Sequence, residues 1–269
     1  MVDIDKAKCA RCGACVRDCI VGTLKTGSDG FPVMTPEDAE FCIQCQHCLA
    51  VCPKGAVTCN GVSAADVPLS GQVPDPDRVL NLLRQRRSVR HFKDENVSGE
   101  ILKKLEDSLR WSPTGCNARM LHFSIVEDKA RMEFYREEVR KSLLFLQKTG
   151  IMQLFYPNLN RYLDKIKAGE DVIFRKAPHI IVASVHKKAP CKEADPWLAL
   201  SYFDCMAQSL GLGTCWCGFG VYAFKYISKI RKTLELPDGF RVAAVMLFGY
   251  PDVTYARATL PQEFPVHRI

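Results

Sequence analysis

The sequence predicts an α+β fold in two parts, a small cysteine-rich domain over residues 1–60 and a larger α+β domain over 77–269. Three observations predict it. Eight of the 14 cysteines fall in two runs near the start of the chain. The stretch 61–76 follows them with turn-forming residues and no periodicity, as is typical of a linker. Beyond it, amphipathic segments of helical length alternate with short apolar segments, which favours one large core.

The two cysteine runs have the same internal spacing, and the second repeats the first after 33 residues. In C-x₂-C-x₂-C-x₃-C spacing, three thiolates reach three corners of one iron–sulfur cube, while the fourth points toward another cube. The spacing therefore predicts two [4Fe–4S] clusters that exchange their last cysteines. The expected ligands are Cys9, Cys12, Cys15 and Cys52 for one cluster, and Cys42, Cys45, Cys48 and Cys19 for the other.

These runs resemble those of bacterial two-cluster ferredoxins. The second run ends in the expected Cys52-Pro53, whereas the first ends in Cys19-Ile20, which departs from the turn signature but removes no ligand. Zinc is the alternative interpretation. Structural zinc sites usually pair two C-x₂-C units across a long loop, so a four-cysteine run that occurs twice fits them poorly.

The roles of the other six cysteines stay open. With 269 residues the chain can bury a core without disulfides, and no signal peptide precedes its first predicted ligand. We therefore expect a cytoplasmic protein in a reducing, oxygen-poor setting. Apolar runs such as 179–185 and 242–248 are far shorter than the ~20 residues of a membrane-spanning helix, so no membrane partner is expected. The unassigned cysteines are Cys59, Cys116, Cys191, Cys205, Cys215 and Cys217.

The formal charge of +7 is unevenly distributed along the chain. Residues 1–60 carry six Lys/Arg against seven Asp/Glu, so the basic excess lies in the larger domain. Two oxidised clusters would add about two negative charges each to the small domain. The positive charge of the larger domain would then attract an acidic electron-transfer domain and a phosphate-bearing cofactor. No helix-turn-helix, zinc-finger or aromatic-basic motif supports a nucleic-acid partner.

The elements of the larger domain follow in order. A helix is expected from near Asp77, because Pro76 suits an opening turn. Ser98 can cap a second helix that runs to about Trp111, and a long charged helix covers 129–148. Glycines between 211 and 220 are expected to break the chain. The remaining expectations are strands from near His122, over 178–185 and over 241–249, and helices from Asp195-Pro196 and over 223–234.

Three segments of the larger domain suggest a bound cofactor. Arg86-Arg87-Ser88-Val89-Arg90 follows a helix end, where its cations can offset the helix dipole and hold a phosphate. Residues 112–117 form a turn-rich loop with short polar side chains that could hydrogen-bond a planar heterocycle. Residues 210–220 are glycine-rich, which allows close backbone approach to a flavin. Alone, the first is more often a solvated face and the second an ordinary connection.

The glycine-rich segment lacks the G-x-G-x-x-G order of a dinucleotide-binding fold, so that fold is not expected. In this order and at this separation, the three segments and Gly249-Tyr250-Pro251 resemble the FMN-dependent nitroreductase family over roughly 77–269. The resemblance implies an α+β flavoprotein that forms a homodimer, with each FMN held at the interface by residues of both chains.

The resemblance also implies roles for individual residues, although it identifies no catalytic side chain. Arg86, Arg87, Ser88 and Arg90 would grip the phosphate and ribityl chain, with Arg257 in the tail assisting. Pro113, Thr114 and Asn117 would approach the ring from the partner subunit. The backbone of Cys217, Gly218 and Phe219 would pass beside the redox-active nitrogen of the ring.

Some positions depart from the family pattern. Arg119-Met120-Leu121 stands where many members have Gln-Pro-Trp, and Gly218 stands where several members carry an acidic side chain. The resemblance places a variable lid over the flavin at 150–176, where substrate choice would reside. Its aromatic residues, which are more often packing than substrate contacts, are Phe155, Tyr156, Tyr162 and Phe174.

The sequence thus predicts an FMN-dependent oxidoreductase. Electrons would enter singly at the two clusters from an external ferredoxin or other redox protein, pass to FMN, and leave in pairs to a small electrophilic acceptor. A nitroaromatic, a quinone or an activated alkene would suit. Alternatively, NAD(P)H reduces FMN and the clusters carry electrons outward to a protein partner. A redox or oxygen sensor is a third hypothesis. The acceptor, the direction of flow, the cluster potentials and the docking partner of the small domain stay open.

Overall fold

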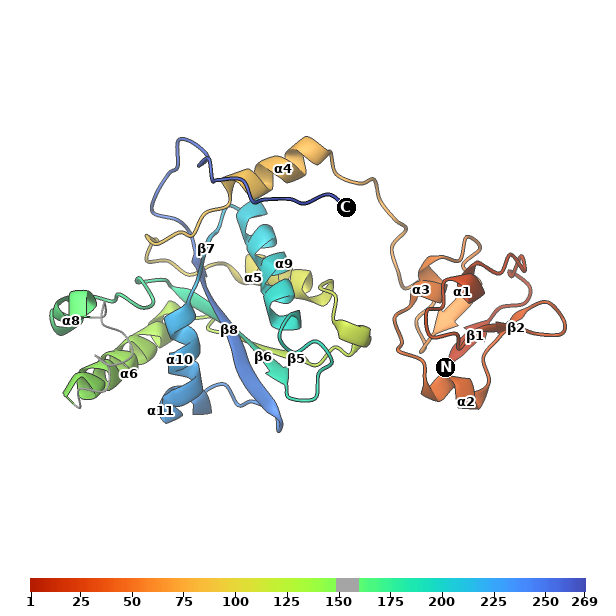
Figure 1. Cartoon of the computed structure of the whole chain (residues 1–269), viewed down its shortest axis with the longest axis horizontal. Helices are drawn as coiled ribbons and strands as arrows, with labels where there is room; N and C mark the ends of the chain where they lie inside the picture. Colours follow the sequence, from red (N-terminus) through yellow and green to blue (C-terminus); the bar gives the residue numbers. More distant parts are fainter. Residues whose placement is uncertain (149–159) are drawn as a thin grey trace. The chain divides into compact units, whose positions relative to one another are not determined.

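The computed structural model describes residues 1–148 and 160–269, and the chain divides into two compact units (Figure 1). The first comprises Met1–Val73 with Cys116–Ala118, and the second Pro74–Gly115 with Arg119–Ile269. Residues 61–73, expected to be linker, group with the first unit. The reason is visible in the packing, because Val62 and Val67 contact its apolar core.

The first unit consists of two short antiparallel ladders and three short helices. Its buried residues include Val2, Leu24, Leu49 and Val57, which form one small core. Strand β1 (Val2–Ile4) pairs with β4 (Val57–Cys59), and β2 (Lys25–Thr26) pairs with β3 (Pro32–Val33). The helices are α1 (Ala14–Arg17), α2 (Pro36–Glu40) and α3 (His47–Ala50).

The sequence repeat is also a repeat of backbone conformation. Gly13 and Gln46, which are 33 residues apart, both have left-handed φ angles of 69° and 62° and immediately precede α1 and α3. Arg11 and Gln44 are likewise equivalent, with φ angles of 54° and 55°. Each run of cysteines therefore follows the same turn into a one-turn helix.

The described residues of the second unit are organised around a four-stranded antiparallel sheet in the order β5-β6-β8-β7. Its strands are β5 (Leu121–Ile125), β6 (His179–His186), β7 (Gly213–Trp216) and β8 (Phe240–Gly249). Its described α-helices are α4 (Pro76–Gln85), α5 (Gly99–Arg110), α6 (Lys129–Lys148), α8 (Asn160–Lys167), α9 (Asp195–Ser209), α10 (Gly218–Tyr226) and α11 (Ser228–Lys232). The 3₁₀ turn η1 (Gly115–Asn117) begins at the last residue of this unit before Cys116–Ala118, which group with the first unit.

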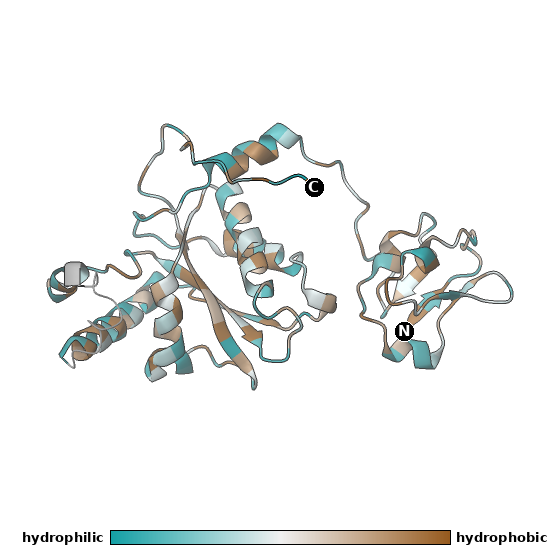
Figure 2. Ribbon diagram, in the orientation of Figure 1, coloured by the Kyte–Doolittle hydropathy of each residue, from teal (hydrophilic) through white to brown (hydrophobic). Residues whose placement is uncertain are grey.

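Helices cover both faces of this sheet, because successive strand residues point to opposite sides. On one face Ile181 of β6 packs with Leu105 of α5 and Phe203 of α9. On the other face Ile180 of β6 packs with residues of α6 and α10, among them Phe224. Figure 2 shows the apolar colour running along the strands between these helices. Among the described residues, no helix is long and apolar enough to cross a membrane.

Most of the expected elements are confirmed. Ser98 caps α5 by accepting from the Ile101 N–H at 3.4 Å, and α6 has the expected bounds. The single helix expected over 223–234 is wrong, because α10 begins five residues earlier and the chain turns to an extended conformation at Ile227 (φ −82°, ψ 103°) before α11. The expected glycine break is also wrong at 213–220, since Gly213 lies in β7 and Gly218 and Gly220 lie in α10.

Candidate functional site

The first unit contains two cavities, and each is lined by one of the predicted cysteine sets. The first cavity is enclosed by apolar residues of β1, β4 and the start of α1, including Ile4 and Val57. The cysteines that line it are Cys9, Cys12, Cys15 and Cys52. The second cavity has Val2, Leu24 and Met34 in its wall. The cysteines that line it are Cys19, Cys42, Cys45 and Cys48, together with Cys59.

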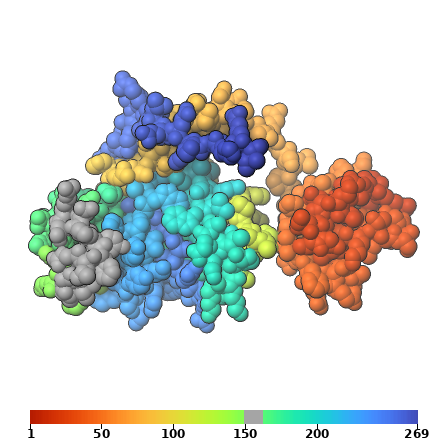
Figure 3. Space-filling model, in the orientation of Figure 1, coloured from red at the N-terminus to blue at the C-terminus, as the bar shows by residue number. Residues whose placement is uncertain are grey.

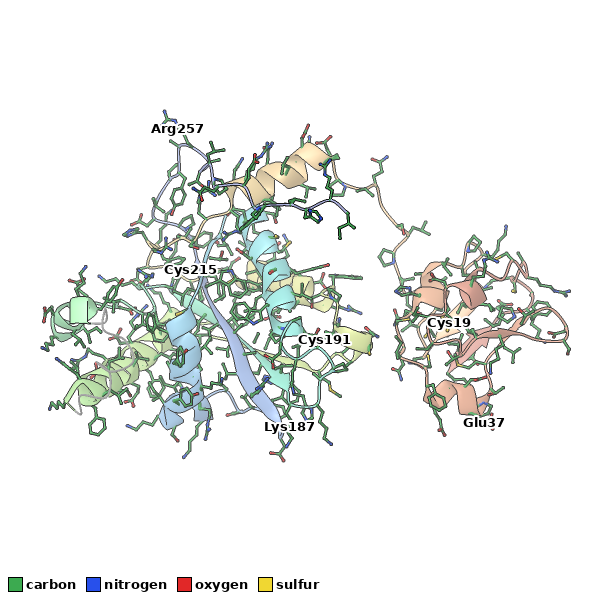
Figure 4. All side chains as sticks on the ribbon, in the orientation of Figure 1. Cys19, Glu37, Lys187, Cys191, Cys215 and Arg257 are labelled. Carbon is green, nitrogen blue, oxygen red and sulfur yellow. The ribbon has the colours of Figure 1, made fainter. Side chains whose placement is uncertain are left out.

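The cysteine sulfurs also accept hydrogen bonds from their surroundings. The Ala56 N–H donates to the Cys52 sulfur at 3.3 Å, and the Thr23 hydroxyl lies 3.3 Å from the Cys19 sulfur. Among the described residues, no group of three or more His, Cys, Asp or Glu converges closely enough to hold a single metal ion, and each cysteine set instead surrounds a cavity. In Figure 4 Cys19 lies inside the first unit, whereas Glu37 of α2 lies at its edge.

Burial controls the protonation of several of these thiols. Desolvation and the neighbouring Cys59 raise the pKa of the Cys48 thiol to about 12. Burial also raises the pKa values of the Cys15 and Cys59 thiols. At Cys19 burial acts in the same direction, but hydrogen bonds from the Thr23 side chain and from nearby backbone N–H groups outweigh it, and its pKa is lowered. Metal binding must displace these protons, since the thiolate is the ligand form.

In the second unit, the arginine segment and the glycine-rich segment lie side by side. Ser88 forms a parallel bridge with Thr214 of β7, and the Val89 N–H donates to the Thr214 carbonyl at 2.8 Å. Gly213 makes this approach possible, because a Cβ atom there would lie 2.5 Å from a methyl group of Val89. Two segments that the sequence separates by more than 120 residues thus form one surface.

The arginine side chains of this segment are held in different ways. Arg86 lies 3.6 Å from the buried carboxylate of Asp204, on α9. Arg87 donates to the Arg84 carbonyl at 2.8 Å, while its Nη2 atom is buried with no hydrogen-bond partner among the described residues. Arg90 donates to the Ser88 carbonyl at 3.2 Å. A buried guanidinium nitrogen without an acceptor fits an anionic oxygen from a ligand.

Asp204 links these pieces and was not expected from the sequence. It accepts a hydrogen bond from the Thr214 hydroxyl and faces the Arg86 guanidinium. Burial raises the pKa of its carboxyl, against the opposing effects of Thr214 and Arg86. Its position in the middle of the apolar helix α9 could have drawn attention, because a buried carboxylate requires partners.

The loop after α5 contacts the N-terminal end of α9, away from Asp204. The Gly115 N–H donates to the buried carboxylate of Asp195 at 3.1 Å, in the first turn of α9. Asp195 and Asp204 are nine residues apart, so the two contacts are separated by about 13 Å along the helix axis. Pro113 and Thr114 belong to this loop, and Asn117 follows it with a φ angle of 50°. No described hydrogen bond or ion pair joins this loop to the arginine segment within one chain.

The start of α10 continues directly from β7. Cys217 precedes the helix, its thiol is buried, and burial raises its pKa to about 12, so it remains a neutral thiol near pH 7. Gly218 opens the helix, and a Cβ atom there would meet nothing within 4 Å. Phe219 is 44% exposed. The backbone at this point is therefore accessible, whereas the neighbouring thiol is not.

The other predicted residues lie elsewhere. Arg257 is exposed at the upper edge of the second unit, whereas Cys215 lies on β7 within the unit (Figure 4). Of the expected lid aromatics, Phe155 and Tyr156 lie outside the described residues. Phe174 is fully buried and belongs to the core, as packing would predict, and Tyr162 is 42% exposed.

Two families match the chain in separate regions. The nitroreductase family matches residues 83–250, which cover most of the second unit. A 4Fe–4S dicluster domain matches residues 8–57, which include both cysteine runs. The two matches follow the order that the sequence predicts.

Curated relatives and solved structures match the second region. An iodotyrosine deiodinase from Thermotoga neapolitana is 27% identical over 179 residues, covering 65% of this chain and 89% of the relative. An FMN reductase [NAD(P)H] from Bacillus subtilis is 24% identical, covering 71% and 74%. The fold is similar to that of a nitroreductase with bound FMN from Desulfitobacterium hafniense, with a TM-score of 0.58 at 20% identity, covering 71% of this chain and 98% of that one.

Proposed function

The chain belongs to the nitroreductase family and is an FMN-dependent oxidoreductase with a 4Fe–4S ferredoxin domain, and we propose that it passes electrons from two [4Fe–4S] clusters to FMN and then to a small electrophilic acceptor. One observation carries the proposal. Each of the two predicted cysteine sets lines its own cavity in the first unit. A chain with two such cavities and a flavoprotein fold can store electrons in one part and use them in the other.

The cysteines are proposed as cluster ligands with the assignment that the spacing predicts. The first cluster would take its fourth ligand, Cys52, from the second run, and the second cluster would take Cys19 from the first run. The apolar cavity walls and the hydrogen bonds at Cys19 and Cys52 support this assignment. Both features are typical of iron–sulfur sites, because burial and hydrogen bonds to sulfur set the reduction potential.

The arginine segment is proposed to hold the FMN phosphate. The unpartnered Nη2 of Arg87 supports it, and Arg86 and Arg90 add positive charge beside it. The backbone of Gly218 and Phe219 would face the flavin ring, since both residues are exposed at the start of α10. When bound, FMN would accept electrons singly and deliver them in pairs. Arg257 remains a proposed phosphate contact.

A homodimer is proposed to complete the flavin site. The 13 Å offset along α9 supports it, because Pro113, Thr114 and Asn117 would serve the partner's flavin more readily than their own. Helix α4 exposes Val79, Leu80 and Leu83 by 41–53%, and none of its residues is buried. The C-terminal segment, which Figure 3 shows on the surface of the second unit, exposes further apolar side chains, Leu260, Phe264 and Val266, by 79–99%. Apolar surface of this kind is typical of an interface.

A second candidate uses the same cofactors in the opposite direction. NAD(P)H would reduce FMN, and the clusters would deliver electrons to a protein partner. The similarity to the FMN reductase [NAD(P)H] of Bacillus subtilis favours it. This candidate predicts turnover that depends on a protein acceptor, with little activity toward nitroaromatics or quinones.

The two candidates are separated by an anaerobic titration of the purified holoprotein with NADH, NADPH and a reduced low-potential ferredoxin. Flavin and cluster absorbances are followed separately. Under our proposal, the reduced ferredoxin bleaches the clusters first and the flavin within the time of one turnover. Rapid bleaching of the flavin by a pyridine nucleotide would support the second candidate. Reduced clusters that never reduce the flavin would refute the proposal.

A further inference from the structure

The two cysteine-lined cavities come from a repeated sequence, but different side chains face their sulfurs. Cys19 and Cys52 are equivalent in the repeat, and four residues after each come Thr23 and Ala56. Thr23 is buried, with 3% exposed, and its hydroxyl lies 3.3 Å from the Cys19 sulfur. Ala56 offers Cys52 a backbone N–H at 3.3 Å and has no hydroxyl to add. The second cavity therefore contains one side-chain donor that the first lacks.

The strand pair β1–β4 adds a second difference. Its register places Ile4 opposite Val57 and Val2 opposite Cys59. The pair Ile4 and Val57 lines the first cavity, and the pair Val2 and Cys59 lines the second. Val57 and Cys59 thus lie two residues apart on β4, one beside each cavity. The Cys59 thiol is 1% exposed and lines the second cavity together with Cys48.

We propose that Thr23 and Cys59 are positioning residues that raise the reduction potential of the cluster held by Cys19, Cys42, Cys45 and Cys48 above that of the other cluster. Once the ligand cysteines bind iron as thiolates, their sulfurs can only accept, so the S–H of Cys59, which lines the same cavity, is placed to donate to them. The Thr23 O–H donates to Cys19 in the same way. Donors at cluster sulfurs stabilise the reduced form, because that form carries one more negative charge.

This proposal rests on the proposed function, since it requires both clusters to be present. The reaction it concerns is a one-electron couple in which no bond forms or breaks. An electron shared between the two clusters would reside mainly on the second one. Cys59 would remain outside the ligand set, although it lines the second cavity as the ligands do.

Exchange variants test the proposal on the anaerobically reconstituted full chain. Cys59→Val and Thr23→Ala remove the two side-chain donors from the second cavity, and Val57→Cys places a thiol beside the first. Each is compared with the wild type in a redox titration followed by electron paramagnetic resonance. We expect Cys59→Val combined with Thr23→Ala to shift the second cluster about tenfold toward its oxidised form, or about 59 mV for one electron. Val57→Cys should raise the potential of the first cluster.

Cys59→Ser distinguishes a hydrogen bond from packing. Its hydroxyl can still donate, so most of the wild-type potential should be retained. If Cys59→Ser shifts the second cluster as far as Cys59→Val does, the effect is one of packing and the proposal is overturned. The same holds if the potentials of all variants equal those of the wild type.

The iron content distinguishes a failure of this proposal from a failure of the proposed function. Wild-type protein that binds no cluster would refute the proposed function itself. Wild type and Cys59→Val should both retain about eight iron atoms per chain. Loss of half the iron in Cys59→Val would make Cys59 a ligand and would overturn its positioning role.

Discussion

The Arg86 guanidinium lies 3.6 Å from the buried carboxylate of Asp204, so a residue of α9 fixes a cation at the end of α4. The same carboxylate accepts from the Thr214 hydroxyl on β7. One side chain therefore connects a helix, a strand and the proposed phosphate site. Arginines that are oriented before a phosphate arrives lose less conformational entropy when it binds.

Asp204→Asn should weaken FMN binding about tenfold, which corresponds to about 1.4 kcal/mol. The amide oxygen can still accept from Thr214, so the fold should persist, but the charge that holds Arg86 is lost. Flavin fluorescence quenching gives the dissociation constant. Glu193→Gln is the matched control, because it removes an exposed ion pair with Arg241 on the same unit and should leave FMN affinity unchanged. Equal affinity of Asp204→Asn and wild type would show that Arg86 needs no partner.

The contact between Gly213 and Val89 gives a second prediction. A Cβ atom at 213 would lie 2.5 Å from a Val89 methyl group, so Gly213→Ala should destabilise the second unit by about 1–3 kcal/mol. Urea unfolding followed by tryptophan fluorescence measures it, because all three tryptophans lie in this unit.

Adding Val89→Ala should restore part of the loss in the double variant, since it removes the methyl groups that clash. Gly99→Ala is the control, because a Cβ atom there meets nothing within 4 Å. A full loss in the double variant would mean that the Val89 Cβ atom, which would lie 2.7 Å away and is retained in alanine, causes the clash rather than the methyl groups.

The sequence predicted features that depend on local spacing. Cysteine spacing indicated two sets of ligands, and each set lines its own cavity. Ser98 indicated the start of a helix, because capping requires only the next turn of the chain. Both features can be predicted from a motif in the sequence, the helix cap from one turn of chain and the exchange of Cys19 and Cys52 from the repeated spacing.

Features that depend on tertiary contacts were not predicted. Strand β7 was expected to be a glycine-rich break, but pairing with β8 and with Ser88 outweighs the low strand propensity of glycine. Asp204 and Thr23 had no motif of their own, since their roles come from groups brought near them by folding. Cys59 stayed unassigned because it belongs to neither cysteine run. Only the register of β1 and β4 shows that it lies beside a cavity.

Iron content gives a third prediction, which tests the ligand assignment. Cys12→Ser and Cys45→Ser should each lower the iron content from about eight to about four atoms per chain, because each removes a ligand of a different cluster. Iron and acid-labile sulfide are measured after anaerobic reconstitution. Cys205→Ser, on α9 of the second unit, should retain the full content. Full iron in either ligand variant would reject the assignment of that cysteine.

The buried imidazole of His179 leads to a prediction about pH. Its Nε2 atom accepts from the Val97 N–H at 2.9 Å, and its Nδ1 atom lies 3.0 Å from the Val126 carbonyl. The ring is 0% exposed, and burial lowers its pKa below 6.5. In the folded protein the His179 ring is therefore neutral, with its proton on Nδ1. Protonation would turn Nε2 into a donor that faces another donor.

Because the pKa is lower in the folded state, His179 contributes its full stability above pH 6.5 and loses it as the pH falls through the folded pKa. The free energy of unfolding of the second unit should thus fall between pH 7 and pH 5, by at most about 1.4 kcal/mol per pH unit from this residue. In His179→Gln that dependence should be weaker, so the difference between wild type and variant should shrink as the pH falls. The exposed His91, changed to Gln, is the control. If the difference in unfolding free energy between wild type and variant stays constant with pH, unfolding is not coupled to protonation of His179. The residue would then contribute through packing alone.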